Sequence, residues 1–341
     1  MKNILFFFFF SFILLISCKE ESIDPIPEIT NTWEKVNDLP GDYRYLLKIK
    51  GNSIYMVCYN EGYKFASSQD SGKSWRVSDL GFVPKYDVGF LFVEGAKFFI
   101  AGEDGLFESS DNGITWSENI SLRNYINPNY PLLRIPTLNC IDVQGSEIFL
   151  GQLVPGGCGH GAHVNGLFYS SDNGDSWSCP SSVETPWRVT AVKKMNNVLV
   201  ISDFKVFYSE DSLNTWQVAN GGSGDVAEFR RDDLRLYAIH YGFIKYSDVN
   251  GKYWVNCTPP EINNGLGIIS TFTFNKNTMF IMDDKGVVHF TNKSAIEWKT
   301  LDIAIPAFDP FPYENQAMFT IGNEYLYYIS NDKMWRRKIT E

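Results

Sequence analysis

The sequence is poor in the residues that build most metal and redox sites. It has 6 cysteines and 4 histidines in 341 residues, and no two cysteines form a CxxC pair. We therefore expect no zinc ribbon, no thioredoxin-type site, and neither a metal nor another cofactor. Basic residues are also few, with 30 Lys and Arg against 40 Asp and Glu and no basic cluster. This charge balance argues against nucleic acid as a partner.

Helical patterns are missing as well. Downstream of residue 20 we find no convincing amphipathic stripe, although aromatic residues make up 16% of the chain. These aromatics occur in short alternating runs, which are typical of strands, because flat and β-branched side chains pack well on a half-buried pleated surface. The sequence predicts an all-β fold.

The N-terminal apolar run is too short to cross a bilayer comfortably. Ile4–Ile16 has 13 residues, fewer than a membrane-spanning helix needs. It is followed by Ser17 and Cys18, and LISC resembles the lipobox of bacterial lipoproteins. The resemblance implies that residues 1–17 are a signal peptide and that Cys18 carries lipid. An ordinary signal peptide or an anchor helix is the alternative.

Residues 18–30 are expected to be a lipid-anchored tether. Lys19-Glu20-Glu21 resembles the surface-export signal of Bacteroidetes lipoproteins, and Pro25 and Pro27 favour an extended spacer. We expect an outer-membrane lipoprotein that is held to the membrane by its lipid and exposed at the cell surface. An anchor that faces the periplasm is the alternative.

An odd number of cysteines follows Cys18. Export permits disulfides, but an odd number leaves at least one thiol outside any pair within the chain. The spacing does not fix the pairing among Cys58, Cys140, Cys158, Cys179 and Cys257.

Tryptophans recur at a nearly constant interval. The steps between them are 42, 41, 61, 39, 38 and 44 residues. A period near 40 predicts a propeller or a solenoid. The repeating positions are Trp33, Trp75, Trp116, Trp177, Trp216, Trp254 and Trp298.

An octapeptide box ends at most of these tryptophans. Three copies are nearly perfect, SQDSGKSW, SSDNGITW and SSDNGDSW, and a fourth reads SEDSLNTW. Aspartate can accept backbone N–H groups in a tight turn, glycine supplies a positive φ, and tryptophan buries a large face. We interpret the box as a structural turn, because a calcium loop needs carboxylates at several alternate positions. The box positions are Asp70, Gly72, Trp75, Asp111, Gly113, Trp116, Asp172, Gly174, Trp177, Asp211 and Trp216.

The box resembles the Asp-box, or BNR, repeat of sialidases, sortilin-type receptors and photosystem assembly factors. The resemblance covers residues 33–340 and implies that each box is the hairpin between the third and fourth strands of a propeller blade. Six complete four-strand units begin near Tyr43, Tyr86, Arg134, Arg188, Asp225 and Gly267.

The two ends of the chain supply one more unit. Residues 316–339 give three strands, and 33–37 give a lone fourth strand. We predict a seven-bladed β-propeller of four-stranded antiparallel blades over residues 31–341, with the last blade closed by the N-terminal strand. Such closure removes open sheet edges.

Two insertions flank the third blade on the face opposite the boxes. They are 122–133 and 152–165, and loops on a rigid scaffold often carry binding. Tyr125 and Tyr130 suit a sugar ring or a protein partner, while packing against the propeller is the alternative.

The second insertion contains Cys158, His160 and His163, a set that could ligate a metal. A Cys158–Cys179 disulfide is simpler, with both histidines left as candidate ligand contacts.

Three arginines are expected near the mouth of the channel. Arg134 lies in an RIP tripeptide that resembles the sialidase motif whose arginine holds the substrate carboxylate, and Arg44 and Arg188 also precede innermost strands. The resemblance breaks because two boxes precede this motif and no aspartate follows in a plausible mouth loop. Glu228 and Tyr237 could be given catalytic roles, but no spacing demands it.

We therefore expect a non-catalytic module that binds a glycan or an envelope protein. A sialidase-like glycoside hydrolase centred on Arg134 is the alternative, and an assembly factor for an envelope complex is a second alternative.

Overall fold

The computed structural model describes most of the chain downstream of residue 27. The described residues are 28–29, 32–82, 88–102, 105–129, 138–152, 166–180, 188–224, 226–232, 235–240, 242–248, 250–260, 262, 269–275, 278–283, 285–292, 297–301, 318–330 and 333–340. Within these residues, no helix is both long enough and apolar enough to span a membrane.

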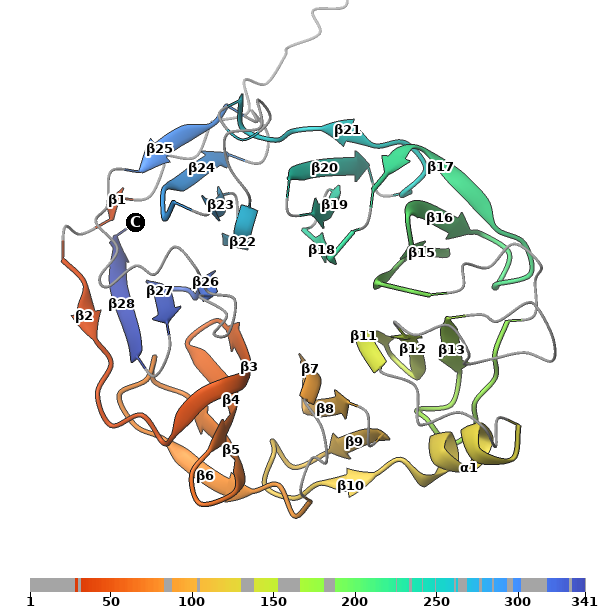
Figure 1. Cartoon of the computed structure of the whole chain (residues 1–341), viewed down its shortest axis with the longest axis horizontal. Coiled ribbons are helices and arrows are strands. Elements are labelled where there is room, and N and C mark those ends of the chain that lie inside the picture. Colours follow the sequence, from red (N-terminus) through yellow and green to blue (C-terminus); the bar gives the residue numbers. More distant parts are fainter. Residues whose placement is uncertain are drawn as a thin grey trace, which may run out of the picture.

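Seven antiparallel sheets stand around a common axis as the blades of a propeller, with the first strand of each blade nearest the axis (Figure 1). Blade 1 is β3 (Asp42–Lys50), β4 (Ser53–Tyr59), β5 (Tyr63–Ser68) and β6 (Arg76–Asp79). Blade 2 is β7 (Val88–Glu94), β8 (Lys97–Gly102), β9 (Gly105–Ser109) and β10 (Ser117–Glu118). Blade 3 is β11 (Leu138–Gln144), β12 (Glu147–Gln152) and β13 (Leu167–Ser170).

The remaining blades follow in chain order. Blade 4 is β14 (Ala191–Met195), β15 (Val198–Ser202), β16 (Lys205–Ser209) and β17 (Gln217–Ser223). Blade 5 is β18 (Glu228–Arg231), β19 (Arg235–His240), β20 (Phe243–Asp248) and β21 (Val255–Asn256). Blade 6 is β22 (Ile269–Asn275), β23 (Thr278–Asp283), β24 (Val288–Asn292) and β25 (Lys299–Leu301). Blade 7 is β26 (Met318–Ile321), β27 (Tyr325–Ser330) and β28 (Lys333–Thr340). The predicted all-β, seven-bladed propeller is confirmed.

The core lies between neighbouring blades. Phe65 of blade 1 meets Phe98 of blade 2 edge to face, with ring centroids 5.8 Å apart, and Trp116 meets Phe65 at 5.3 Å. Edge-to-face aromatic pairs stabilise by about 0.5–1.5 kcal/mol beyond the burial of their area. The alternating aromatics of the sequence are therefore the contacts that join one blade to the next.

Blade 3 departs from the four-strand pattern. Its described part has three strands, and an isolated bridge between Tyr169 and Ser178 stands where a fourth strand is expected. Two backbone hydrogen bonds make this bridge, at 2.9 Å and 2.8 Å.

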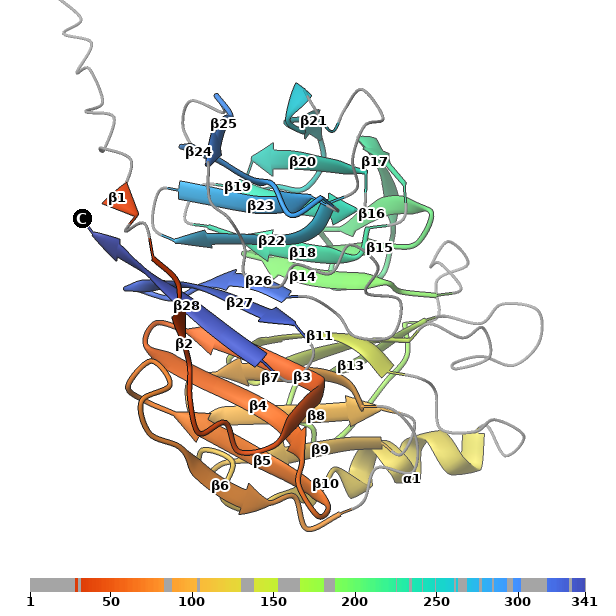
Figure 2. The ribbon, with the colours of Figure 1, turned by 60° about the vertical axis from the view of Figure 1, so that its left-hand side comes forward.

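Blade 7 is closed by the N-terminal end of the chain, as predicted. The strand β2 (Glu34–Lys35) pairs with β28, with Glu34 opposite Arg336 and Lys35 opposite Trp335. The short strand β1 (Glu28–Ile29) pairs with the far end of β28 (Figure 2). The pairing thus begins inside the 18–30 segment that the sequence suggested was only a tether.

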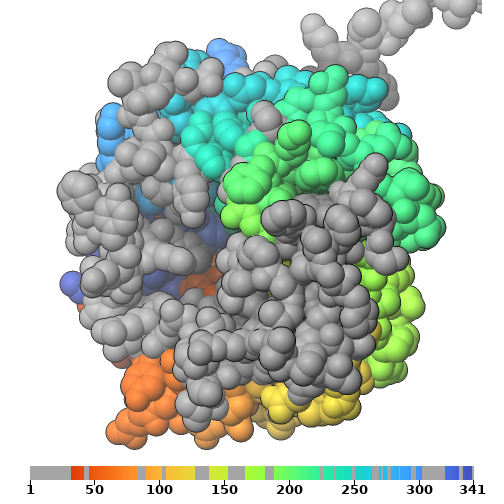
Figure 3. All heavy atoms as spheres, turned by 45° about the vertical axis from the view of Figure 1, so that its right-hand side comes forward, coloured from red at the N-terminus to blue at the C-terminus, as the bar shows by residue number. Residues whose placement is uncertain are grey.

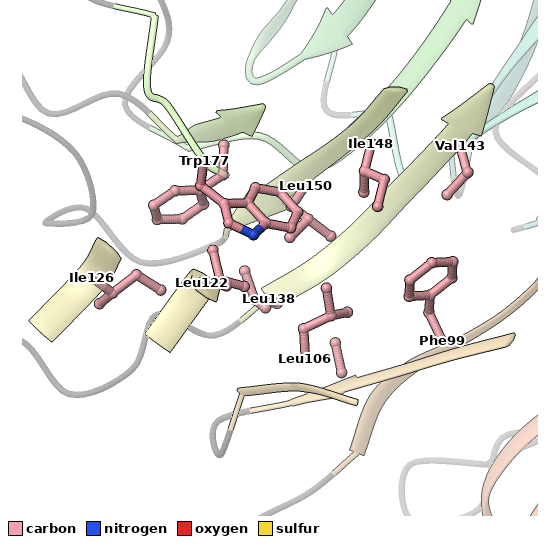
Figure 4. Close-up of a cluster of buried hydrophobic side chains, with 11 residues drawn as sticks. Phe99, Leu106, Leu122, Ile126, Leu138, Val143, Ile148, Leu150 and Trp177 are labelled. Carbon is pink, nitrogen blue, oxygen red and sulfur yellow. The ribbon is translucent and has the colours of Figure 1, made fainter. Parts of the chain in front are cut away.

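A helix overlaps the first predicted insertion, in which the sequence shows no convincing amphipathic stripe. The helix α1 (Ile120–Asn129) leaves blade 2 next to blade 3. Asn119 caps its first turn, because Asn119 Oδ1 accepts a hydrogen bond from Leu122 N at 2.8 Å. Leu122 and Ile126 of α1 are buried beside Trp177 and Leu138 (Figure 4). The sequence did not point to this helix, because burial against the neighbouring blades stabilises a segment with little amphipathic pattern of its own.

Candidate functional site

The box turns are held by their own aspartates. In the second box, Asp111 Oδ1 accepts hydrogen bonds from Ile114 N at 3.0 Å and Thr115 N at 2.9 Å. Asp111 Oδ2 accepts from Thr115 Oγ1 at 2.6 Å, and Ser109 Oγ donates to Asp111 Oδ1 at 2.7 Å. Asp70, Asp172 and Asp211 accept equivalent bonds from the residue four positions on in the first, third and fourth boxes.

These hydrogen bonds keep the box carboxylates ionised. The Ser74 hydroxyl, together with backbone and Ser68 hydrogen bonds, lowers the pKa of Asp70 to about 2. The Thr115 hydroxyl and its N–H lower the pKa of Asp111 as well. Because the oxygens already accept bonds from the turn, they are poorly placed to ligate a cation. Among the described residues, no group of three His, Cys, Asp or Glu side chains is arranged to hold a metal ion.

The box glycines lie where one blade touches the previous one. Gly113 has a φ of +78°, and a Cβ built there would stand 2.1 Å from the Phe65 ring of blade 1. Gly251 of blade 5 would likewise clash with Val200 of blade 4 at 2.4 Å. In the fourth box, Leu213 occupies the glycine position with a φ of +74°, which is strained for a residue with a side chain. The turns therefore also interlock the blades.

Several residues that the sequence singles out, the expected lipidation site Cys18 among them, lie outside the described residues. They are Cys18, Tyr130, Arg134, Cys158, His160 and His163, and only the backbone of Arg44 is described, within β3.

Two other predicted contacts are described, and both are engaged within the protein. Tyr125 lies on α1, and its ring meets the Phe168 ring edge to face with the centroids 6.5 Å apart. This contact matches the alternative in which Tyr125 packs against the propeller. Arg188 Nε donates to Asp203 Oδ1 at 2.6 Å, and its guanidinium lies 4.1 Å from the centroid of the Phe204 ring. Asp203 and Phe204 form the turn between β15 and β16, on the face opposite the boxes, and Phe204 is 68% exposed.

A group of charged side chains from three different blades converges in the central channel. Lys48 of β3 interacts electrostatically with Glu228 and Arg230 of β18 and with Lys193 of β14. Blades 1 and 5 are not neighbours but stand on opposite sides of the ring (Figure 1). In the space-filling view, blades 1 and 2 lie below in orange and yellow, and blades 4 and 5 lie above in green and cyan (Figure 3). The interaction between Lys48 and Glu228 therefore crosses the channel.

Two ion pairs occupy part of this channel cluster, by which we mean Lys48, Asp142, Lys193, Glu228 and Arg230. Arg230 Nε lies 2.9 Å from Glu228 Oε1, and Lys193 Nζ lies 2.5 Å from Asp142 Oδ1. The Asp142 side chain is buried, whereas the exposed fractions are 25% for Lys193, 27% for Arg230 and 44% for Glu228. Water therefore reaches Lys193, Arg230 and Glu228, whereas Asp142 is shielded from it.

The pKa shifts in the channel follow from this enclosure. Desolvation is the largest effect on Lys48 and lowers its pKa, and Arg230 and Lys193 lower it further against the opposing effect of Glu228. Desolvation raises the pKa of Glu228, but Arg230, Lys48 and Lys193 together outweigh it, so the net shift is downward. Glu228 is therefore an ionised carboxylate.

The described tyrosines that hydrogen-bond to carboxylates are held protonated. Tyr237 is buried and donates to Asp232 Oδ2 at 2.9 Å, and desolvation and the Asp232 charge raise the pKa of Tyr237. Tyr169 donates to Glu147 Oε1 at 3.1 Å, and desolvation followed by the Glu147 charge raises the pKa of Tyr169. Both shifts oppose formation of a tyrosinate nucleophile.

The cysteines divide into bonded and reduced groups. Cys179 is disulfide-bonded; its predicted pairing with Cys158 stays a prediction, because Cys158 lies outside the described residues. Cys140 and Cys257 carry free thiols. Desolvation raises the pKa of Cys257 to about 12 and also raises that of Cys140.

Sequence reasoning missed most of the channel cluster. It considered Glu228 as a catalytic group but singled out neither Lys48, Lys193 nor Arg230. Each is an ordinary polar position on an alternating strand, and the group exists only because the ring brings blades 1, 4 and 5 to one axis. Counting charges at equivalent positions of the innermost strands would have been the available signal.

The fold and the channel define the class of protein, a seven-bladed β-propeller with a charged central channel. No protein-family model matches the chain, and neither does any curated protein.

Solved structures resemble the chain in fold. A structure of YCF48 bound to D1 peptide is 16% identical, with a TM-score of 0.61 over 92% of this chain and 96% of that one. YCF48 from Cyanidioschyzon merolae is 11% identical, with a TM-score of 0.58 over 90% and 98%. PorZ, a surface component of the type-IX secretion system of Porphyromonas gingivalis, is 12% identical, with a TM-score of 0.57 over 90% of this chain and 39% of PorZ. At these identities the likeness concerns the fold.

Proposed function

We propose that this chain is a non-catalytic binding module of the cell envelope that takes a protein partner at the end of its channel. The observation that carries the proposal is the channel cluster, in which blades 1, 4 and 5 present charged groups that water still reaches. A rigid ring that places charges around one opening is suited to recognising a complementary charged group.

The direction of the pKa shifts favours binding over catalysis. A glycosidase of the sialidase type needs an activated tyrosine and a carboxyl group that can donate a proton. In the described part of the ring, burial raises the pKa of Tyr237 and Tyr169, and neighbouring cations lower the pKa of Glu228. These pKa shifts are the reverse of those that such an enzyme needs for its tyrosine and its carboxyl group. Arg134, on which the hydrolase alternative rests, lies outside the described residues.

The comparison with YCF48 supports a protein partner over a glycan. That propeller shares the fold over nearly its whole length and is described in complex with D1 peptide. Escorting an envelope complex during its assembly would be one form of such binding. The exposed Phe204 ring beside Arg188 offers a second contact on the face opposite the boxes.

The proposed location is the outer membrane, with Cys18 lipidated and the propeller at the cell surface. The Leu15-Ile16-Ser17-Cys18 motif and the acidic residues after it support this location, and 39% of the chain of PorZ, a surface component, resembles this propeller in fold. Metabolic labelling with a radioactive fatty acid should mark the native chain and not the Cys18→Ser variant. Protease added to intact cells should degrade the propeller; protection until the outer membrane is opened would place it in the periplasm.

Binding is tested with the full chain in detergent, presented in parallel to a peptide library and to a glycan array. We expect saturable binding to a subset of peptides and none to uncharged glycans. Binding confined to glycans would replace the protein partner with a sugar. Turnover of a sialoside library by the same preparation would contradict the non-catalytic proposal.

A further inference from the structure

A pocket of about 430 Å³ lies where the N-terminal segment that closes blade 7 enters blade 1. Its described lining consists of residues 39–41, which lead from β2 into β3, and residues 59–61, at the turn between β4 and β5. The box of blade 1 follows the other end of β5, so the pocket lies on the face opposite the boxes. Its volume falls within the range of pockets that bind small groups.

The two walls of the pocket are tied to each other. Asn60 Nδ2 donates a hydrogen bond to the carbonyl oxygen of Pro40 at 3.1 Å. A Cβ on Gly41 would stand 2.7 Å from the carbonyl oxygen of Tyr59, so the glycine lets the two segments approach closely. A wall that is fixed before a ligand arrives loses less conformational freedom on binding. The pocket is therefore preformed.

Tyr59 gives the pocket an aromatic side chain that water reaches. It is 48% exposed, and its ring meets the Tyr63 ring edge to face with the centroids 5.5 Å apart. This contact orients the Tyr59 ring although much of it is in water. An exposed ring of this kind can take a cation on its face, or an uncharged sugar ring can pack against it.

Glu61 decides between these two ligands. It is exposed, and it is the one charged side chain among the described residues that line the pocket. Lys64, the cation of the same hairpin, is already paired with Asp79. The φ of Glu61 is +50°, a conformation that costs stability for a residue with a long side chain. The Glu61 carboxylate is therefore open to a cation from outside the chain, whereas an uncharged sugar would leave its charge unmatched.

We infer that this pocket binds a basic side chain, an arginine guanidinium or a lysine ammonium, through the Tyr59 ring and the Glu61 carboxylate. The net charge of the chain, −10, favours the approach of a positively charged partner. The site itself follows from the pocket, its aromatic ring and its charge. Only the assignment of the basic group to a protein rests on the proposed function.

Four small ligands test the site by saturation-transfer NMR titrations of the full chain in detergent. N-acetyl-arginine amide and N-acetyl-lysine amide carry the cation, and N-acetyl-citrulline amide has nearly the shape of the arginine compound without its charge. Methyl glucoside represents an uncharged sugar. We expect at least one cationic amide to bind about fivefold or more tightly than the citrulline amide. Added salt should weaken this binding, because the Glu61 charge is exposed.

Variants test whether Tyr59 and Glu61 make the site. Glu61→Gln and Tyr59→Leu should each weaken binding of the cationic amide about threefold or more, and Tyr59→Phe should retain it. The matched controls are Glu297→Gln and Tyr253→Leu, at exposed positions of other blades, and both should bind as the wild type does. A melting curve for each variant separates loss of binding from loss of folding.

The inference is overturned if the citrulline amide or methyl glucoside binds as tightly as the cationic amides. It is also overturned if neither cationic amide binds, or if a folded Glu61→Gln variant binds them as the wild type does. Selected peptides that bind the wild type and Glu61→Gln equally would overturn this site while leaving the proposed function intact. Cationic amides that bind at Glu61, with no peptide or protein ever bound, would overturn the proposed function while leaving this site intact.

Discussion

At the scale of single residues, a box glycine is sensitive to substitution because a side chain of the previous blade lies against it. Gly113 and Gly145 both have positive φ values, +78° and +62°. A Cβ at Gly113 would meet the Phe65 ring at 2.1 Å, whereas a Cβ at Gly145 has no atom within 4 Å. The same substitution at these two sites therefore separates backbone strain from collision between blades.

Gly113→Ala is expected to destabilise the protein by about 1–3 kcal/mol more than Gly145→Ala does, because overpacking adds to the shared strain of a positive φ. Chemical denaturation followed by tryptophan fluorescence measures the difference in the free energy of unfolding. Equal losses at the two sites would show that the contact with Phe65 yields without cost.

The box aspartates predict how stability responds to acid. The pKa of Asp70 is lowered to about 2 in the folded state, while an unfolded aspartate titrates near pH 4. Its contribution is therefore complete above about pH 4 and is lost as the pH falls through about 2. Asp70→Asn should be less stable than the wild type at pH 7 and should lose less stability between these two pH values. Asp175→Asn, at an exposed carboxylate of the third box, is the control and should follow the wild type.

The raised pKa values of the free thiols predict that Cys257 and Cys140 react slowly with thiol reagents. The thiolate is the reactive form of cysteine, and a pKa of about 12 for Cys257 leaves very little of it at pH 8. Cys257 and Cys140 should react with a disulfide reagent about 100-fold or more slowly in the native protein than in denaturant. The absorbance of the released thiolate, with alanine variants to assign each phase, measures both rates. Rapid reaction in the native protein would mean that these sites open readily.

At the scale of elements, Asn119 joins three pieces of structure. Its Oδ1 accepts hydrogen bonds from Leu122 N at 2.8 Å and Trp177 Nε1 at 3.1 Å, and its Nδ2 donates to Gly174 O at 3.2 Å. The side chain is buried, so one amide connects the end of blade 2, the start of α1 and the box of blade 3.

Asn119→Ala should cost about 1–3 kcal/mol of unfolding free energy, because it leaves the buried Leu122 N–H without an acceptor and removes one of the two acceptors of Trp177 Nε1. Asn124→Ala, at an exposed position of the same helix, should change stability little. Thermal or denaturant unfolding of the two variants gives the comparison, and similar values for both would contradict the linking role of Asn119.

The elements also show which features the sequence could predict. Tryptophan spacing predicted the blades and their closure, because each box repeats within its own unit. The helix α1 was missed, since Leu122 and Ile126 are buried only by tertiary packing against blades 2 and 3. The single bridge at Tyr169 and Ser178 was missed because the box before it is intact. The channel cluster was missed because Lys48 and Glu228 are separated by four blade lengths in the sequence.

At the scale of the whole molecule, β28 holds the ring shut. It pairs with β27 on one side and with β2 and β1 on the other. Arg336 of β28 reinforces this junction, because it donates to Glu34 Oε2 at 3.2 Å and to the carbonyl oxygen of Ser71 in blade 1 at 2.7 Å.

A chain that ends after residue 332 lacks β28 and should lose its sharp cooperative unfolding transition, because blade 7 then has no strand for the N-terminal segment to join. A chain that lacks only Glu341 is the control. Calorimetry and protease resistance report the change. A truncated chain that melts as sharply as the control would show that six blades suffice for a closed ring.

The closure of blade 7 by the two ends of the chain has a consequence for when the ring can form during synthesis. A ribosome makes a chain from its N-terminal side to its C-terminal side, yet Glu28 and Glu34 find their partners only in residues 333–340. The strands β1 and β2 must therefore stay unpaired until residues 333–340 have been made. Until then the ring is an unfinished circle with two open sheet edges, and β28 closes both.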